Sequence, residues 1–302
     1  MRGRIQRLIN FLVHASVHRP YYALRNTEVV WGKLLNREGR KLYRAHPSAL
    51  NTLQKTLLGE LKDEGICSTT LEELFHEKPL LDELHGHAFG LLSSASRRTK
   101  KAYLKFLFER VPLLDMGNPF VALALEGRIL DIVNAYMGLW SKFRAFTLNL
   151  TAPMPDGAKE IYSQRWHRDS EDKRIVKVFL YLNDVDESAG PFMYILGSHY
   201  GGKWSKIFPQ DPPYGSYPPQ GAVEKIIPES DFKACTGPAG AIIFCDTTGL
   251  HKGGHAKSGE RLMFTAVYTS KGCVNPLEYS YPENFERSIM KLGAAQRYAL
   301  RN

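Results

Sequence analysis

The sequence predicts an α+β protein with a mainly helical first half and a sheet-rich second half. Between residues 1 and 140, apolar side chains recur at the three- to four-residue spacing of helices. After Gly138 the pattern changes to short β-prone segments separated by glycine and proline turns. The composition, 43% hydrophobic and 24% charged over 302 residues, is that of an ordinary globular protein. Several short strands of this kind favour a sandwich or a barrel.

Residues 1–45 predict a basic helical extension. Ile5, Leu8, Ile9, Leu12 and Val13 fall at helical spacing, with arginines opposite. The segment holds ten Lys/Arg and two acids, so it carries +8 of the chain's net +9. We expect the helix to pack on its own domain. Contact with a membrane surface or an acidic partner is the minority alternative.

Residues 46–302 are close to neutral and predict a single domain. Because the positive charge is confined to one end, we expect no binding to nucleic acid. The sequence has no run of about 18 apolar residues, so no transmembrane segment is expected. Its four cysteines include no C-x-x-C pair, which predicts reduced thiols in a cytoplasmic protein.

The elements of the domain follow in order. Helices are indicated by capping residues, terminal glycines or apolar residues at helical spacing. Their predicted ranges are 46–65, 69–75, 100–110 and 118–136. Strands are predicted at 143–151, 161–166, 174–183, 192–196, 241–246 and 261–269. Residues 197–236, rich in proline, glycine and tyrosine, predict a long insertion that is either functional or mobile.

The strongest chemical signal is a set of metal-ligating residue types. His167 and Asp169 are two apart, so on an extended segment both side chains point the same way. His251 follows the strand predicted at 241–246. Two imidazoles and one carboxylate can hold one face of an octahedral iron and leave three positions open. His255 competes with His251 for this role; we prefer His251, which is nearer the strand end, but the sequence alone leaves the choice open.

Arg261 opens the apolar strand predicted at 261–269. An arginine at the surface, at the start of a strand, would need no functional explanation. Inside a barrel, however, a guanidinium needs an anion, because a buried unpaired charge is costly. A carboxylate suits its forked geometry, and a dianionic cosubstrate would supply one.

An ordered set of motifs resembles the phytanoyl-CoA dioxygenase family over roughly residues 50–272. The motifs are 164–169, 177–186, 190–192 and 197–199, followed by His251 and Arg261. The resemblance implies a double-stranded β-helix (jelly roll) and dependence on Fe(II), 2-oxoglutarate and dioxygen. One departure concerns residues 253–259, which lack an asparagine that the family's founding enzyme has there. The founding enzyme's acyl-CoA substrate is therefore not carried over.

The resemblance also implies residue roles. His167, Asp169 and His251 would hold the iron, and Arg261 would bind the distal carboxylate of 2-oxoglutarate. Phe179 and Asn149 match positions beside the cosubstrate. Related halogenases lack the carboxylate ligand, so Asp169 favours hydroxylation or a similar oxidation.

The substrate is predicted to be a small organic molecule. Lys177 shares the strand parity of Phe179 and Tyr181, so all three face one side. A lysine facing the cavity would suit an anionic group on the substrate, and Arg168 lies in the same basic neighbourhood. A solvated, charge-balanced edge is the equal alternative.

Two other functions are compatible with the fold. A cupin-like isomerase or hydrolase could use the same ligands for another metal, but it would have no need of Arg261. A non-catalytic binding protein could keep the fold, but it would have no need of an intact set of ligands.

Overall fold

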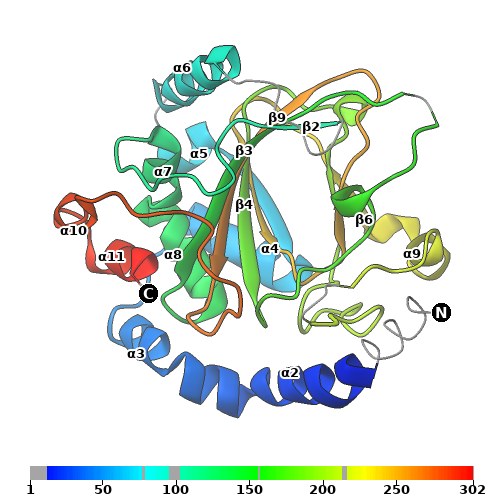
Figure 1. Cartoon of the computed structure of the whole chain (residues 1–302), viewed down its shortest axis with the longest axis horizontal. Helices are drawn as coiled ribbons and strands as arrows, with labels where there is room; N and C mark the ends of the chain where they lie inside the picture. The colour runs from blue at the N-terminus through cyan, green and yellow to red at the C-terminus, as the bar shows by residue number, and fades with distance from the viewer. Residues whose placement is uncertain (1–11, 77–78, 95–102, 156, 213–215, 302) are drawn as a thin grey trace.

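The computed structural model describes residues 12–76, 79–94, 103–155, 157–212 and 216–301. Two antiparallel sheets face each other, and helices cover the outer face of the larger one (Figure 1). The predicted α+β jelly roll with a mainly helical N-terminal half is confirmed. Among the described residues, none of the helices combines the length and the apolar character needed to cross a bilayer.

The larger sheet has the strand order β1-β7-β4-β9-β3-β2. Four of its six strands match predicted segments, with boundaries shifted by two residues at most. Its members are β1 (Ile66–Thr70), β2 (Leu104–Phe106), β3 (Lys142–Thr151), β4 (Ile175–Tyr181), β7 (Ala241–Asp246) and β9 (Arg261–Thr269). The smaller sheet has the order β6-β5-β8, from β5 (Phe192–Ile195), β6 (Phe232–Cys235) and β8 (His251–Gly253).

The larger sheet separates two apolar layers, as β4 illustrates. Val178 and Leu180 face the helices, whereas Phe179 and Tyr181 face the smaller sheet. Because successive side chains of a strand alternate, one strand serves both layers. The inner layer, between the sheets, positions the candidate site.

Helices pack on the outer face of the larger sheet. α4 begins at the Asn51 cap and ends at Gly65, which has a φ of 84°. A capping box formed by Thr70 and Glu73 starts α5, within the helix predicted at 69–75. The helices on this side are α4 (Thr52–Glu64), α5 (Leu71–Phe75), α6 (Pro79–Ser94), α7 (Pro119–Ala124), α8 (Gly127–Met137), α10 (Phe285–Ser288) and α11 (Ala294–Leu300). α9 (Ala222–Ile226) packs beside the smaller sheet instead, through Val223.

The described part of the N-terminal segment is mainly helical, with breaks at Asn26–Thr27 and at Asn36. It comprises η1 (His14–His18), α2 (Arg19–Arg25), η2 (Glu28–Leu35) and α3 (Arg37–Ala45), of which η1 and η2 are π-helical. In Figure 1 it runs along the lower edge of the molecule. Ile5, Leu8 and Ile9, on which part of the prediction rested, lie outside the described residues.

Three predicted elements were wrong. The segment 100–110 contains β2 instead of a helix, because β3 offers an open edge with which residues 104–106 pair. The segment 161–166 forms a 3₁₀ turn, η3 (Tyr162–Gln164), in which the Gln164 side chain takes the Ile161 amide that a strand partner would have bonded. The helix at 118–136 is interrupted at Glu126, whose backbone is extended.

The stretch 197–236, predicted as an insertion, contains regular structure. Its last residues form β6, a strand of the smaller sheet, and α9 and η5 (Glu229–Asp231) precede it. Four residues of β6 pair with β5, so the fold's second sheet depends on this stretch. A composition rich in turn residues concealed the strand.

We expect Leu61→Ala to destabilise the protein by about 2–5 kcal/mol, because Leu61 is fully buried between α4 and the larger sheet. Leu34→Ala is the matched control: Leu34 is 66% exposed, so a change within about 0.5 kcal/mol is expected. Urea unfolding of both variants measures the difference. Equal losses would contradict the assignment of the core.

Candidate metal centre

The metal motif lies in an extended segment held against β8. The amide of His167 donates to the carbonyl of His251, and the amide of His251 donates back, both at 3.0 Å. The amide of Asp169 donates to the carbonyl of Thr247 at 2.9 Å. This pairing keeps the backbone extended, so His167 and Asp169 point to the same side.

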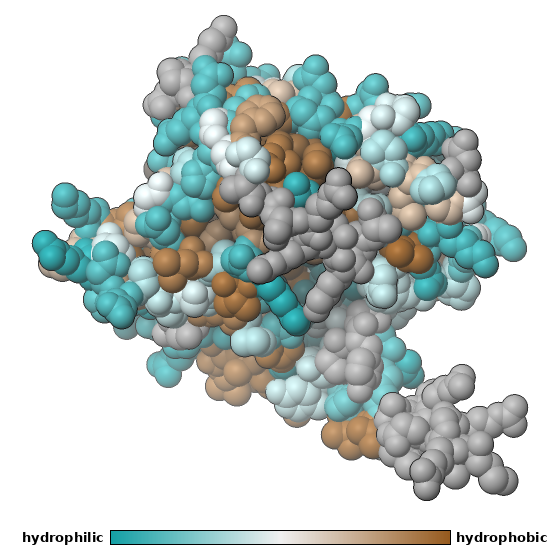
Figure 2. Space-filling view, turned by 45° about the horizontal axis from the view of Figure 1, so that its top comes forward, coloured by the Kyte–Doolittle hydropathy of each residue, from teal (hydrophilic) through white to brown (hydrophobic). Residues whose placement is uncertain are grey.

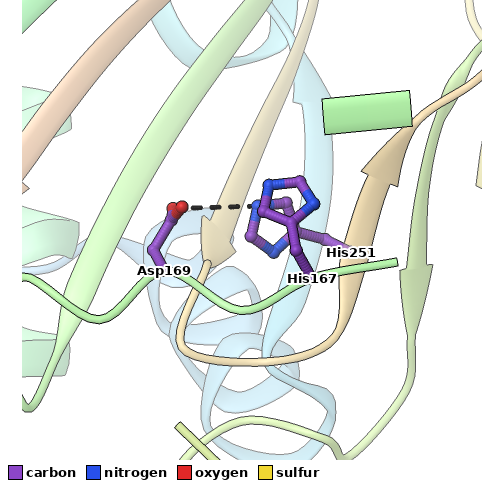
Figure 3. A group of neighbouring side chains, drawn as sticks. All are labelled: His167, Asp169 and His251. Carbon is purple, nitrogen blue, oxygen red and sulfur yellow. Dashed lines mark ion pairs between the residues drawn. The ribbon is translucent and has the colours of Figure 1, made fainter. Parts of the chain in front are cut away.

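His167, Asp169 and His251 come together as predicted. One ligand atom from each lies within 4.8 Å of the others (Figure 3). Both imidazole rings point toward the carboxylate, from two separate segments of the chain. Among the described residues, His251 belongs to this group and His255 does not.

Hydrogen bonds fix the tautomer of each histidine. His167 Nδ1 lies 2.8 Å from the carbonyl of Arg165, and His251 Nδ1 lies 2.9 Å from the carbonyl of Gly249. A carbonyl can only accept, so in each ring Nδ1 carries the proton and the lone pair is on Nε2. Two neutral imidazoles and a carboxylate form a donor set that fits a divalent transition metal.

The charges in the cluster favour an ionised Asp169 carboxylate and a neutral His251 ring. Burial, together with His167, lowers the pKa of His251 to about 3. Burial opposes ionisation of Asp169, but Lys177 and the two histidines outweigh it and hold the pKa of Asp169 below its usual value. The contact of 3.7 Å between His251 Nε2 and Asp169 Oδ2 in Figure 3 therefore joins a neutral ring to an anion.

Lys177 faces the cluster, on the same side of β4 as Phe179 and Tyr181. Its Nζ lies 2.6 Å from Asp169 Oδ2. Burial lowers the pKa of Lys177, but Asp169 and Glu171 raise it by more, so the amine is charged. In turn, burial and Asp169 raise the pKa of Glu171 to about 7.

Arg261 is a buried cation at the start of β9. Its guanidinium donates to the carbonyl of Gly190 and, at 3.4 Å, to Thr151 Oγ1. No carboxylate among the described residues pairs with it, and its Nε has no hydrogen-bond partner there. Burial lowers the pKa of Arg261, but a guanidinium stays charged. Tyr181 interacts with the guanidinium, but no carboxylate of the described residues balances its buried charge.

Phe179, Tyr181 and Asn149 line the same space between the sheets. Phe179 contacts Phe192 with ring centroids 4.6 Å apart, and Phe192 contacts His251 at 5.7 Å. The hydroxyl of Tyr181 donates to the carbonyl of Cys235 at 2.8 Å. Thr151 pairs with Arg261, and Asn149 lies two residues before Thr151 on β3. Asn149 and Arg261 therefore lie on the same face of the sheet.

Arg168 points away from the cluster. Its guanidinium is almost fully buried and donates only to backbone carbonyls, among them those of Phe208 at 2.7 Å and Thr248 at 2.6 Å. These bonds fasten the segment 198–208 to the metal motif. A cleft of about 910 Å³ lies beside Arg168, between α2 and residues 200–212, and none of the other predicted site residues lines it. The contacts of Arg168 are structural and lend no support to the predicted contact with substrate.

Asp172 is the residue that the sequence did not reveal. Its buried carboxylate accepts from Trp31 Nε1 and from the amide of Ser270, both at 2.7 Å. Arg25 lies 3.6 Å from the same carboxylate. The N-terminal segment and the end of β9 therefore meet three residues after Asp169.

Two residues of the stretch 197–236 also reach the motif. Tyr217 stacks on the ring of His167, with centroids 5.4 Å apart and planes inclined by 12°. Gln210 Nε2 donates to the carbonyls of Asp169 at 2.6 Å and Asp172 at 3.2 Å. Only the tyrosine-rich composition of the stretch hinted at such contacts.

Comparison with solved structures finds similar folds. EctD from S. alaskensis with 2-oxoglutarate and 5-hydroxyectoine superposes with a TM-score of 0.52 at 15% identity, over 78% of this chain and 89% of that one. The α-ketoglutarate-dependent epimerase SnoN from nogalamycin biosynthesis, in complex with Fe³⁺, α-ketoglutarate and nogalamycin RO, gives 0.51 at 16%, over 72% and 84%. The carbocyclase SnoK from the same biosynthesis gives 0.50 at 14%, over 74% and 85%.

These likenesses show the fold. The sequence matches no protein-family model, and no curated protein matches it either. The similar solved structures therefore support the fold of iron- and 2-oxoglutarate-dependent enzymes, and not the phytanoyl-CoA dioxygenase family specifically.

We expect Trp31→Phe to reduce stability by about 1.5–3 kcal/mol, because a buried hydrogen bond to a carboxylate is lost. It should also weaken metal binding, since Asp172 would hold the Asp169 segment less firmly. Titration with Co(II), followed by its visible spectrum, measures this. Val29→Ala, at an exposed position of η2, is the control for both measurements. Reduced stability with unchanged Co(II) affinity would show that the hydrogen bond between Trp31 and Asp172 does not influence the metal site.

Proposed function

We propose that this protein is a non-haem Fe(II)- and 2-oxoglutarate-dependent oxygenase, with His167, Asp169 and His251 as the metal ligands. The proposal rests above all on the convergence of two Nε2 lone pairs and one carboxylate in the inner layer of a jelly roll. The similar folds SnoN and EctD, whose structures contain 2-oxoglutarate, support it. Iron and the cosubstrate together would supply the oxidising chemistry; the chain supplies position and shelter from water.

Arg261 is the proposed partner of the distal carboxylate of 2-oxoglutarate. Its guanidinium lies beside Gly253, where an added Cβ would be 3.6 Å from Nη2, and Gly253 is two residues from His251 on β8. Two residues of a strand span roughly 7 Å. A short dicarboxylate held at the metal through its keto acid end could cover such a distance. Phe179 and Asn149 would line its path.

For the reaction, we propose hydroxylation or a similar oxidation of a small organic substrate in a reducing, cytoplasmic compartment. The carboxylate of Asp169 favours this outcome over halogenation. Lys177 is bound to Asp169 in the structure, so its ammonium is already balanced, and it would contact an anionic group of the substrate only as a second partner. Four free cysteines support the reducing compartment. The motifs shared with the phytanoyl-CoA dioxygenase family support membership in that family as part of the proposal.

We expect His167→Ala and His251→Ala to abolish succinate formation from 2-oxoglutarate. Each should weaken Fe(II) binding by more than the roughly 10- to 100-fold that loss of an outer contact costs. His255→Ala is the matched control, because this imidazole lies outside the cluster. Metal content and succinate release, measured on all three variants, test the ligand set. Loss of iron in His255→Ala with retention in His251→Ala would reverse the assignment.

Arg261→Ala should raise the apparent KM for 2-oxoglutarate while Fe(II) binding survives. Loss of a charge-assisted contact in a buried site costs roughly 2–5 kcal/mol, or about 30- to several-thousand-fold in affinity. Arg261→Lys, which keeps the charge without the fork, should fall between. The dependence of succinate formation on 2-oxoglutarate and the thermal midpoint are measured on the same samples. A lower midpoint with an unchanged KM would identify Arg261 as purely structural.

A further inference from the structure

Apolar side chains are exposed along the N-terminal helical segment. Val13, Val17, Tyr21 and Leu24 succeed one another at intervals of three or four residues and so share one helix face. Together with their neighbours they form what we call the outer apolar stripe. Its members and their exposed fractions are Leu12 53%, Val13 41%, Val17 57%, Tyr21 55%, Leu24 64%, Val29 57%, Leu34 66% and Leu35 39%.

The segment is oriented contrary to the usual rule for surface helices, which bury their apolar face. Its inward contacts are largely polar: His14 with Asp211 at 2.8 Å, and Arg25 with Asp172 at 3.6 Å. Trp31 is buried, but it too donates a hydrogen bond. Figure 2 shows separate hydrophobic patches on the surface, some of them near the lower edge of that view. Exposed apolar side chains gathered along one segment are typical of an interaction surface.

The same segment carries nearly all the net charge. Residues 1–45 contribute +8, which leaves +1 for the remaining chain. Within the described part, Lys33, Arg37, Lys41 and Arg44 are exposed and form no ion pair with a described residue. Arg37, Lys41 and Arg44 follow the i, i+4, i+7 spacing of one face of α3. An apolar stripe and a cluster of uncompensated cations therefore adjoin on one helical segment.

We propose that the outer apolar stripe docks the protein on an anionic lipid bilayer. Apolar side chains of an interfacial helix enter the boundary between headgroups and acyl chains, and basic residues are attracted to anionic headgroups. Docking on a bilayer in this way needs both the apolar side chains and the basic residues. A nucleic acid would use the cations alone and leave the stripe exposed. A second copy of the chain would bring two segments of +8 together, and their repulsion opposes that contact.

The test uses the full-length protein and sedimentation with vesicles. The expected result is binding to phosphatidylcholine vesicles that contain phosphatidylserine, no binding to phosphatidylcholine alone, and weaker binding at high salt. Leu24→Ser should weaken binding about tenfold, since it removes one large apolar side chain from the boundary. Replacement of Arg37, Lys41 and Arg44 by alanine should weaken it about 100-fold, at roughly 1 kcal/mol for each charge.

Phe89→Ser is the matched control, because Phe89 is 61% exposed on α6, at the opposite edge of the molecule in Figure 1. It should bind the anionic vesicles as the unmodified protein does. Any of three results would overturn the proposal. These are no binding to the anionic vesicles, equal binding to neutral vesicles, and unchanged binding by the Leu24→Ser variant. Sedimentation equilibrium gives the alternative its own readout: a dimer that Leu24→Ser dissociates would identify a second copy as the occupant of the stripe.

Discussion

The buried carboxylate of Asp172 is the constraint on which the arrangement around the metal motif depends. Three segments that are distant in sequence from Asp172 contact this carboxylate. They are η2 through Trp31, the end of α2 through Arg25, and the end of β9 through Ser270. Each interaction also satisfies a polar group that burial would otherwise leave unpaired. The N-terminal segment is thus attached to the body of the protein within three residues of Asp169.

The metal motif is held from both of its sides. His167 and Asp169 point into the inner layer, while Arg168 and Asp172 point outward and bind backbone groups or other segments. The outward bonds have no chemical role of their own, but they fix the positions from which the inward side chains act. Gln210 adds a bond to the carbonyl of Asp169 itself. The stretch 197–236 and the N-terminal segment therefore support the site without supplying its proposed ligands.

Local patterns predicted those features that depend on local physics. The parity of β4 placed Lys177, Phe179 and Tyr181 on one face because strand side chains alternate, and Gly65 ended α4 because its φ is positive. Features that depend on distant neighbours were missed. Apolar spacing could not show that residues 104–106 would pair with an open edge. Trp31 and Asp172 are 141 residues apart, so no pattern could connect them. Arg168 looked like a substrate contact because its carbonyl partners are invisible in sequence.

Under the proposed function, the balance of charge makes the metal and the dicarboxylate depend on each other. Lys177 and Arg261 are cationic, Asp169 is anionic, and Glu171 has its pKa raised to about 7 by burial and by Asp169. A divalent metal added alone would leave the inner layer strongly positive in surroundings that screen charge poorly. A dicarboxylate added alone would have one end at Arg261 and the other beside the carboxylate of Asp169. Bound together, the divalent metal and the dicarboxylate would offset each other's charge, because one adds positive charge and the other adds negative charge.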